Sequence, residues 1–91
     1  MTGTQRGAPA IASMLMRYVS EEILGGSASV GLKDNLLIDG VVDSLGMLRL
    51  VGFIEASFDI TIPPDQFTIE NFRDLEVISS YVERLVEKGN A

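Results

Sequence analysis

Cysteine, histidine and tryptophan are absent from this sequence of 91 residues, and proline occurs only 3 times. Without cysteine the chain forms no disulfide, and without cysteine and histidine it lacks the usual ligands of a zinc site. Histidine is also the commonest general base in enzymes. We therefore expect no metal site and no catalytic residue, and any thiol chemistry has to come from a group added to the chain.

Basic residues are few as well. The sequence has 7 lysines and arginines and 13 acidic residues, which gives a formal net charge of -6. An acidic chain is repelled by nucleic acid and by an anionic membrane surface, so neither is an expected partner. Residues 34–91 hold eleven of the acidic residues and only four of the basic ones. If charge steers docking, a basic protein surface is expected to approach this part of the chain.

Long apolar runs are also missing. No stretch reaches the length of a membrane span, and the first ten residues lack the apolar core of a secretion signal. We therefore expect a cytoplasmic protein without membrane insertion. Hydrophobic residues still make up 46% of the sequence, enough for one folded, monomeric domain. We expect this domain over residues 8–88, after a flexible N-terminal segment at residues 1–7.

Apolar residues recur every three or four positions in three stretches, the spacing that buries one face of a helix. The pattern predicts helices at about residues 8–24 and 44–58, and a third long helix after Asp74, a residue suited to cap it. Between the second and third helices, the segment from Gln66 to Phe72 has room for one short helix. Its predicted core contacts are Phe67, Ile69 and Phe72.

The longest connection runs from Gly25 to Asp43, and a loop of this length in a compact domain is usually functional or held to the core by its own side chains. The candidates for such contacts are Leu32, Leu36, Leu37 and Ile38. The sequence therefore predicts an all-α fold: a small four-helix bundle of three long helices and one short one, with a long loop between helices one and two.

The polar chemistry lies where this loop meets the second predicted helix. Ser44 is at the helix start, where unpaired backbone amides and the helix dipole favour an anion on its hydroxyl. Asp43 beside it is suited to help hold Mg²⁺ while another enzyme transfers a phosphoryl group. A purely structural interpretation is also open, because serine is a favoured N-cap and an Asp-Ser pair is common before helices.

The second predicted helix carries more apolar residues than one buried face requires. Leu45 and Leu48 form a row beside Ser44, and Gly52 continues it. An apolar row that begins next to a reactive hydroxyl indicates a docking surface. The alternative is that the long first loop covers the row.

The run from Gly40 to Leu45, which includes Asp43-Ser44-Leu45, resembles the Asp-Ser-Leu attachment motif of acyl and peptidyl carrier proteins. Downstream, Phe58 to Pro63 is similar to the stretch that follows the second helix in this family, and Glu70 to Leu75 is similar to its short third helix leading into the fourth. The resemblance covers about residues 8–88 in the same order.

This resemblance implies that Ser44 carries a 4'-phosphopantetheine arm, whose terminal thiol holds an acyl or aminoacyl group as a thioester. It also implies that Asp43 helps a phosphopantetheinyl transferase position Mg²⁺, and that Leu45 and Leu48 contact partner enzymes. The implied partners are this transferase, a loading ligase and the acyl-transferring or synthase enzymes that use the cargo. The carrier itself performs no chemistry.

The sequence departs from fatty-acid carriers, which usually place acidic residues after the serine, because it has Gly46 and Arg49 there and its first acid in the helix is Glu55. The spacing of the motif is more similar to stand-alone carriers loaded by an adenylating ligase, including aminoacyl and D-alanyl carriers. A fatty-acid carrier remains the alternative. Arg49 is accordingly a candidate docking residue, or a partner of a neighbouring acid such as Glu55.

Two other classes of function are alternatives to a carrier: a serine hydrolase and a helical interaction module. A serine hydrolase is disfavoured, because the superficially similar Gly-Asp-Ser-Leu block of those enzymes needs a histidine base and a sheet that this chain is too short to build. A helical interaction module without modification is compatible with the periodicity. The intact mass after expression beside a transferase distinguishes such a module from a carrier.

Overall fold

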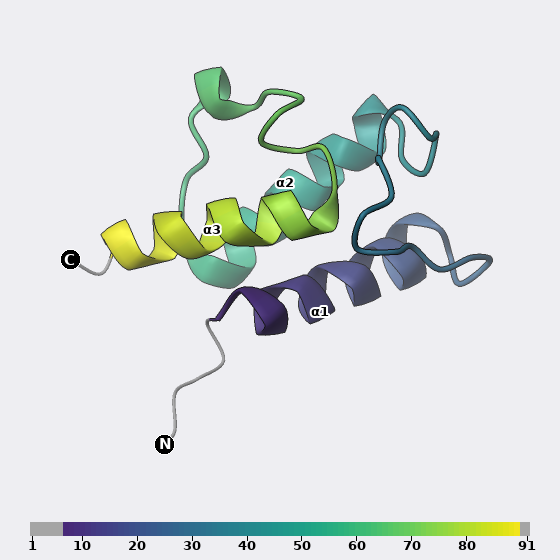
Figure 1. Ribbon diagram of the computed structural model, residues 1–91, viewed down its shortest axis with the longest axis horizontal. Helices are drawn as coiled ribbons and strands as arrows, with labels where there is room; N and C mark the ends of the chain where they lie inside the picture. Colours follow the sequence, from purple (N-terminus) through teal and green to yellow (C-terminus); the bar gives the residue numbers. More distant parts are fainter. Residues whose placement is uncertain (1–6, 90–91) are drawn as a thin grey trace.

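Three α-helices and two short helical turns make up the computed structural model, which describes residues 7–89 (Figure 1). The helices are α1 (Ala8–Tyr18), α2 (Ser44–Phe58) and α3 (Leu75–Gly89). The π-helical turn η2 (Val19–Ile23) extends α1, and the 3-10 turn η3 (Pro64–Gln66) follows α2. The described residues contain no strand, which confirms the all-α prediction.

The predicted flexible segment at residues 1–7 lies outside the described residues except for Gly7. The N-terminal boundary of the domain is therefore a prediction that the structure does not test. Within the described part of the chain, no helix is long and apolar enough to cross a membrane.

The first helix occupies the predicted position but widens in its last turn. There the Leu24 amide donates to the carbonyl of Val19 at 2.8 Å, five residues earlier, which is π-helical spacing. Gly25 and Gly26 then take positive φ angles of 65° and 78°, which side chains disfavour and glycine accepts. The pair of glycines ends the helix, close to the predicted boundary at residue 24.

The core lies between the three helices, whose apolar faces meet as the periodicity predicted. α1 and α3 lie side by side and run in opposite directions, while α2 crosses behind them in the view of Figure 1. Each helix contributes side chains with no exposure to solvent, and burying each of these stabilises the fold by about 1.5–3 kcal/mol. They include Ile11, Leu15, Leu50, Ile54, Leu75, Ile78 and Val82.

The long first loop is held to the core by fewer of its residues than predicted. Leu36 is fully buried, and its amide donates to the carbonyl of Arg73 at 2.9 Å, just before α3. Leu32 and Leu37 are more than one-third exposed and Ile38 is 74% exposed, so the prediction that they face the core is wrong. Val30 and Val42 are buried in their place.

The fourth, short helix is not confirmed. Pro64 to Gln66 form a single 3-10 turn, and the residues after it form a turn that closes with a hydrogen bond from the Phe72 amide to the Thr68 carbonyl at 3.0 Å. Thr68 Oγ1 also accepts from the Asn71 amide at 3.2 Å, so one hydrogen-bonded turn forms here and is not continued into a helix.

Phe72 is buried in the core, as predicted. Phe67 is 36% exposed and Ile69 is 62% exposed, so the predicted core position of Ile69 is wrong. This segment therefore presents apolar side chains at the surface.

The start of α3 confirms the predicted cap. Asp74 is 97% buried, since its exposed fraction is 3%, and its Oδ1 accepts a hydrogen bond from the Val77 amide at 2.8 Å. Its second oxygen, Oδ2, accepts from Nε of Arg73 at 3.1 Å. Both oxygens of this buried carboxylate therefore have donors, which fixes the beginning of the helix.

Candidate functional site

Ser44 is the first residue of α2, and its side chain is exposed. The residue before it, Asp43, has extended backbone angles and acts as the N-cap, because its Oδ1 accepts a hydrogen bond from the Gly46 amide at 2.7 Å. Among the hydrogen bonds of residues 7–89, none involves the Ser44 hydroxyl. Ser44 is therefore not the cap of α2, because Asp43 does the capping, and the attachment role of Ser44 remains a prediction.

Gly46 has a packing role that the sequence did not reveal. A Cβ atom at this position would lie 3.3 Å from Oδ1 of Asp43 and 3.4 Å from both Cγ2 of Ile23 and Cβ of Val42. The absence of a side chain thus lets the first turn of α2 approach the end of η2 closely. This contact fixes the turn that carries Ser44.

The apolar row next to Ser44 is open to solvent. Leu45 is 67% exposed and Leu48 is 56% exposed, so the first loop does not cover either residue. Further along the same face, Gly52 has open space around the position of a Cβ atom. The described chain therefore leaves this face of α2 uncovered, and its docking role remains a prediction.

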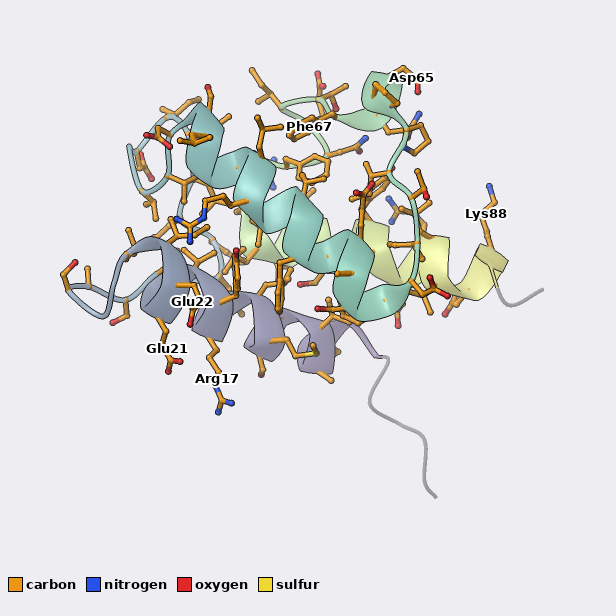
Figure 2. The ribbon with its side chains drawn as sticks, turned by 180° about the vertical axis from the view of Figure 1, so that it is seen from behind. Arg17, Glu21, Glu22, Asp65, Phe67 and Lys88 are labelled. Carbon is orange, nitrogen blue, oxygen red and sulfur yellow. The ribbon has the colours of Figure 1, made fainter. Side chains whose placement is uncertain are left out.

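An apolar hollow of about 270 Å³ lies on one side of Ser44. One wall comes from the first loop and α2, and the other comes from the segment after η3. Phe67 projects from that segment toward α2 (Figure 2). The lining residues are Leu37, Ser44, Met47, Leu48, Phe67, Thr68, Ile69 and Phe72.

A second hollow, of about 330 Å³, lies beside the first turn of α2 and is lined in part by Asp43, Leu45 and Arg49. Nη2 of Arg49 donates to the backbone carbonyl of Glu22 at 3.2 Å, and the Tyr18 hydroxyl donates to the carbonyl of Arg49 at 3.4 Å. Arg49 therefore connects α2 to the end of α1.

The alternative pairing of Arg49 with Glu55 is not found. Oε2 of Glu55 instead accepts from the Ile62 amide at 2.8 Å. The side chain of Glu55 thus holds the connector after α2, and the docking role of Arg49 remains a prediction.

The structure also contains a hollow that the sequence did not predict. It has a volume of about 430 Å³ and is lined by residues of α1, η2 and α2, including Arg17, Glu21 and Glu22, which Figure 2 labels. Its floor includes Tyr18 and Phe53, whose rings stack with centroids 4.1 Å apart. The sequence places Tyr18 and Phe53 on two predicted helices. Whether their rings stack depends on how α1 and α2 pack, which the sequence pattern does not specify.

Potential metal ligands do not gather around Ser44 in the described part of the chain. No group of three or more potential ligands among His, Cys, Asp and Glu lies together within residues 7–89. Burial raises the pKa of the Tyr81 hydroxyl above its usual 10.0, with a smaller contribution from Asp65, and Arg84 opposes the shift. Tyr81 belongs to α3 and does not line either hollow beside Ser44.

A helical bundle that presents an exposed, unbonded serine at the start of a helix, next to an open apolar face, has the arrangement of a carrier domain. No protein-family model matches the sequence. The sequence is 32% identical over 66 residues to the D-alanyl carrier protein of Streptococcus suis strain 98HAH33, an alignment that covers 71% of this chain and 84% of that protein.

Two proteins of Bradyrhizobium diazoefficiens are also similar. The sequence is 34% identical over 55 residues to its aminoacyl carrier protein 1, covering 60% of this chain and 61% of that protein. It is 30% identical over 57 residues to aminoacyl carrier protein 2, covering 63% and 64%. The chain thus spans less than two thirds of these two relatives. It belongs to the carrier protein family, whose members carry their cargo and do not catalyse its reactions.

Proposed function

We propose that this protein is a stand-alone cytoplasmic carrier that holds an acyl or aminoacyl group as a thioester on a 4'-phosphopantetheine arm attached to Ser44. An adenylating ligase loads the arm, and a biosynthetic pathway consumes the cargo. The observation that carries the proposal is the Ser44 hydroxyl, which is exposed at the start of α2 and relieved of capping by Asp43.

Attachment is a phosphoryl transfer from coenzyme A. Oγ of Ser44 forms a bond to the phosphorus nearest the pantetheine, the phosphoanhydride bond breaks, and adenosine 3',5'-bisphosphate leaves while the serine proton passes to a base or to solvent. The product is a phosphodiester that keeps one negative charge. The amides and dipole at the start of α2 favour this charge.

The surroundings of Ser44 suit such an arm. Ser44 itself lines the apolar hollow of about 270 Å³, so the arm can lie along Met47 and Leu48 or extend into solvent. When bound, the arm supplies the thiol that a chain without cysteine lacks. A tethered cargo also reaches each partner at a high effective concentration.

Asp43 is suited to assist the transfer without losing its cap. Oδ1 accepts from the Gly46 amide, and no hydrogen bond among residues 7–89 uses Oδ2. Mg²⁺ is usually held by one or two carboxylates together with substrate phosphates and waters. Asp43 therefore supplies one ligand, and the transferase and coenzyme A supply the others.

The charges on α2 favour a ligase-loaded carrier over a fatty-acid carrier. Arg49 and Glu55 are the only charged residues of the helix, and Glu55 is bonded to the Ile62 amide. A basic partner surface that reads acids along this helix thus finds no free acid in its first half. The names of the relatives, aminoacyl and D-alanyl carrier proteins, agree with this choice.

The test is the intact mass of the apo protein after incubation with coenzyme A, Mg²⁺ and a broad-specificity phosphopantetheinyl transferase. We expect one phosphopantetheine unit on the wild type and on Ser57→Ala, a matched change of the other serine of α2, and none on Ser44→Ala. A wild-type chain that several transferases leave unmodified would favour the unmodified interaction module. Label on another residue would show that Ser44 is not the attachment site.

A further inference from the structure

Ile38 has the most exposed large hydrophobic side chain of residues 7–89, with 74% of its surface open to solvent. It lies in the first loop, six residues before Ser44. A single exposed isoleucine needs no explanation by itself, since folded proteins expose many apolar atoms. Two features distinguish Ile38 from other exposed apolar residues. Its backbone amide is held by a side-chain hydrogen bond, and its turn lies beside Ser44.

The turn that carries Ile38 is held by a network of local hydrogen bonds. The Asn35 side chain accepts from the Ile38 amide at 3.2 Å, and the Asp39 side chain accepts from the Asn35 amide at 3.0 Å. Gly40, with a φ of 73°, reverses the chain, and the Val42 amide then donates to the carbonyl of the buried Leu36 at 3.0 Å. Ile38 is therefore presented by a fixed backbone, and binding through it orders little additional chain.

The same turn borders both hollows beside Ser44. Leu37 lines the apolar hollow together with Ser44, and Gly40 lines the other hollow together with Asp43 and Leu45. A protein that brings its active site onto the Ser44 hydroxyl therefore comes to lie close to this turn.

The charges of the loop are of one sign next to this residue. Asp34, Asp39 and Asp43 each accept a hydrogen bond from a backbone amide, so their carboxylates are held in place. Lys33, the one basic residue in this stretch, lies 4.0 Å from Glu76 of α3. This stretch thus offers one exposed apolar side chain together with three carboxylates that backbone hydrogen bonds hold in place.

We propose that Ile38 is the anchor by which the phosphopantetheinyl transferase recognises this carrier, inserted into an apolar socket that basic side chains surround. This inference rests on the proposed function. The occupant is the transferase because its active site has to reach the Ser44 hydroxyl, which lines a hollow together with Leu37 of this turn. Complementary charge around the socket favours the encounter and fixes its orientation.

The test compares wild type and Ile38→Ser, both in the apo form, as substrates of a broad-specificity transferase with coenzyme A and Mg²⁺. The control is Met14→Ser, which changes an exposed apolar residue on α1. We expect Ile38→Ser to lower kcat/KM about tenfold with little change in kcat and in the melting temperature, and Met14→Ser to change none of them.

A second variant tests the charge. Asp39→Asn keeps an oxygen for the Asn35 amide and removes the negative charge, so we expect a fall in kcat/KM of about twofold to fourfold at low salt that disappears at high salt. Equal kcat/KM for wild type and Ile38→Ser overturns the anchor, even if later loading by a ligase changes. A wild type that no transferase modifies overturns the proposed function instead.

Discussion

Oδ1 of Asp43 accepts a hydrogen bond from the backbone amide of Gly46 at 2.7 Å, and this contact caps α2, which begins at the next residue, Ser44. The bond leaves the serine hydroxyl available while it fixes the turn that presents it. Asp43 thus has a structural role in this chain, beside the catalytic assistance proposed for its other oxygen.

Two substitutions of Asp43 separate these roles. Asp43→Ala removes the cap and should lower the free energy of unfolding by about 1 kcal/mol, whereas Asp43→Asn keeps an oxygen acceptor and should cost less. Both variants should slow the addition of phosphopantetheine, because both lack the carboxylate for Mg²⁺. Urea unfolding measures the first effect and the rate of mass increase measures the second. Modification of Asp43→Asn at the wild-type rate would contradict the role in binding Mg²⁺.

Leu48 and Leu50 provide a matched pair of leucines on α2. Leu50 is fully buried, so Leu50→Ala should cost about 2–5 kcal/mol, whereas Leu48 is 56% exposed and Leu48→Ala should shift the melting temperature little. If Leu48 contacts the loading ligase, Leu48→Ala in the holo form should still slow loading. Loading at the wild-type rate would remove Leu48 from the docking surface.

Glycines at two positions of α2 should respond differently to alanine. Gly52→Ala should stabilise the protein by about 0.5–1 kcal/mol, because the new Cβ has open space and alanine favours the helix. Gly46→Ala should gain less, because its Cβ meets the capping oxygen of Asp43 at 3.3 Å. Thermal unfolding of both variants tests the difference. An equal gain at the two positions would show that the close contact at Gly46 is not a constraint.

Tyr81 has a hydroxyl with no hydrogen-bond partner among the described residues, and its pKa is raised by burial. The folded state therefore holds this proton more tightly than the unfolded state, so the contribution to stability is present below pH 10.0 and is lost as pH rises through the folded pKa. Tyr81→Phe should weaken this alkaline loss and cost little at neutral pH. Unfolding followed between neutral and alkaline pH tests it, and an unchanged alkaline profile would exclude Tyr81 as its source.

Local patterns in the sequence predicted the three long helices and the cap of α3 because these features depend on neighbouring residues. The positions of Leu50 and Ile78 follow from helical periodicity, and the cap by Asp74 follows from its place before the third apolar pattern. The motif around Ser44 was visible for the same reason. The capping role of Asp43 was not, since a serine and an aspartate are equally suited to cap a helix.

Features that depend on contacts between distant residues were not predicted. The bond from Arg49 to the Glu22 carbonyl joins residues 27 positions apart, and the exposure of Ile38 depends on how the loop folds over Leu36. The fourth helix is not confirmed, since Thr68 to Phe72 form a single hydrogen-bonded turn in its place. Periodicity describes one face of a helix and carries no information about these competing contacts.

Arg49 is the position at which this carrier departs most clearly from fatty-acid carriers. Basic partner surfaces meet a like charge here, which disfavours docking, so fatty-acid synthase ketosynthases and reductases should use the holo protein poorly. Arg49→Glu should improve that use, more at low salt than at high salt, because salt screens exposed charges over about 8–10 Å. The substitution also removes the bond to the Glu22 carbonyl and should cost at most about 1 kcal/mol of stability.

Arg49→Gln is the matched control, because its amide keeps a donor for Glu22 while the positive charge is lost. Turnover of the three holo proteins by fatty-acid partners, and by an adenylating ligase encoded near this gene, measures both preferences. If charge decides, Arg49→Gln should fall between wild type and Arg49→Glu with the fatty-acid partners. A wild type that is already an efficient fatty-acid substrate, with no change on substitution, would remove the main support for the ligase-loaded assignment and leave Arg49 as a brace between α1 and α2.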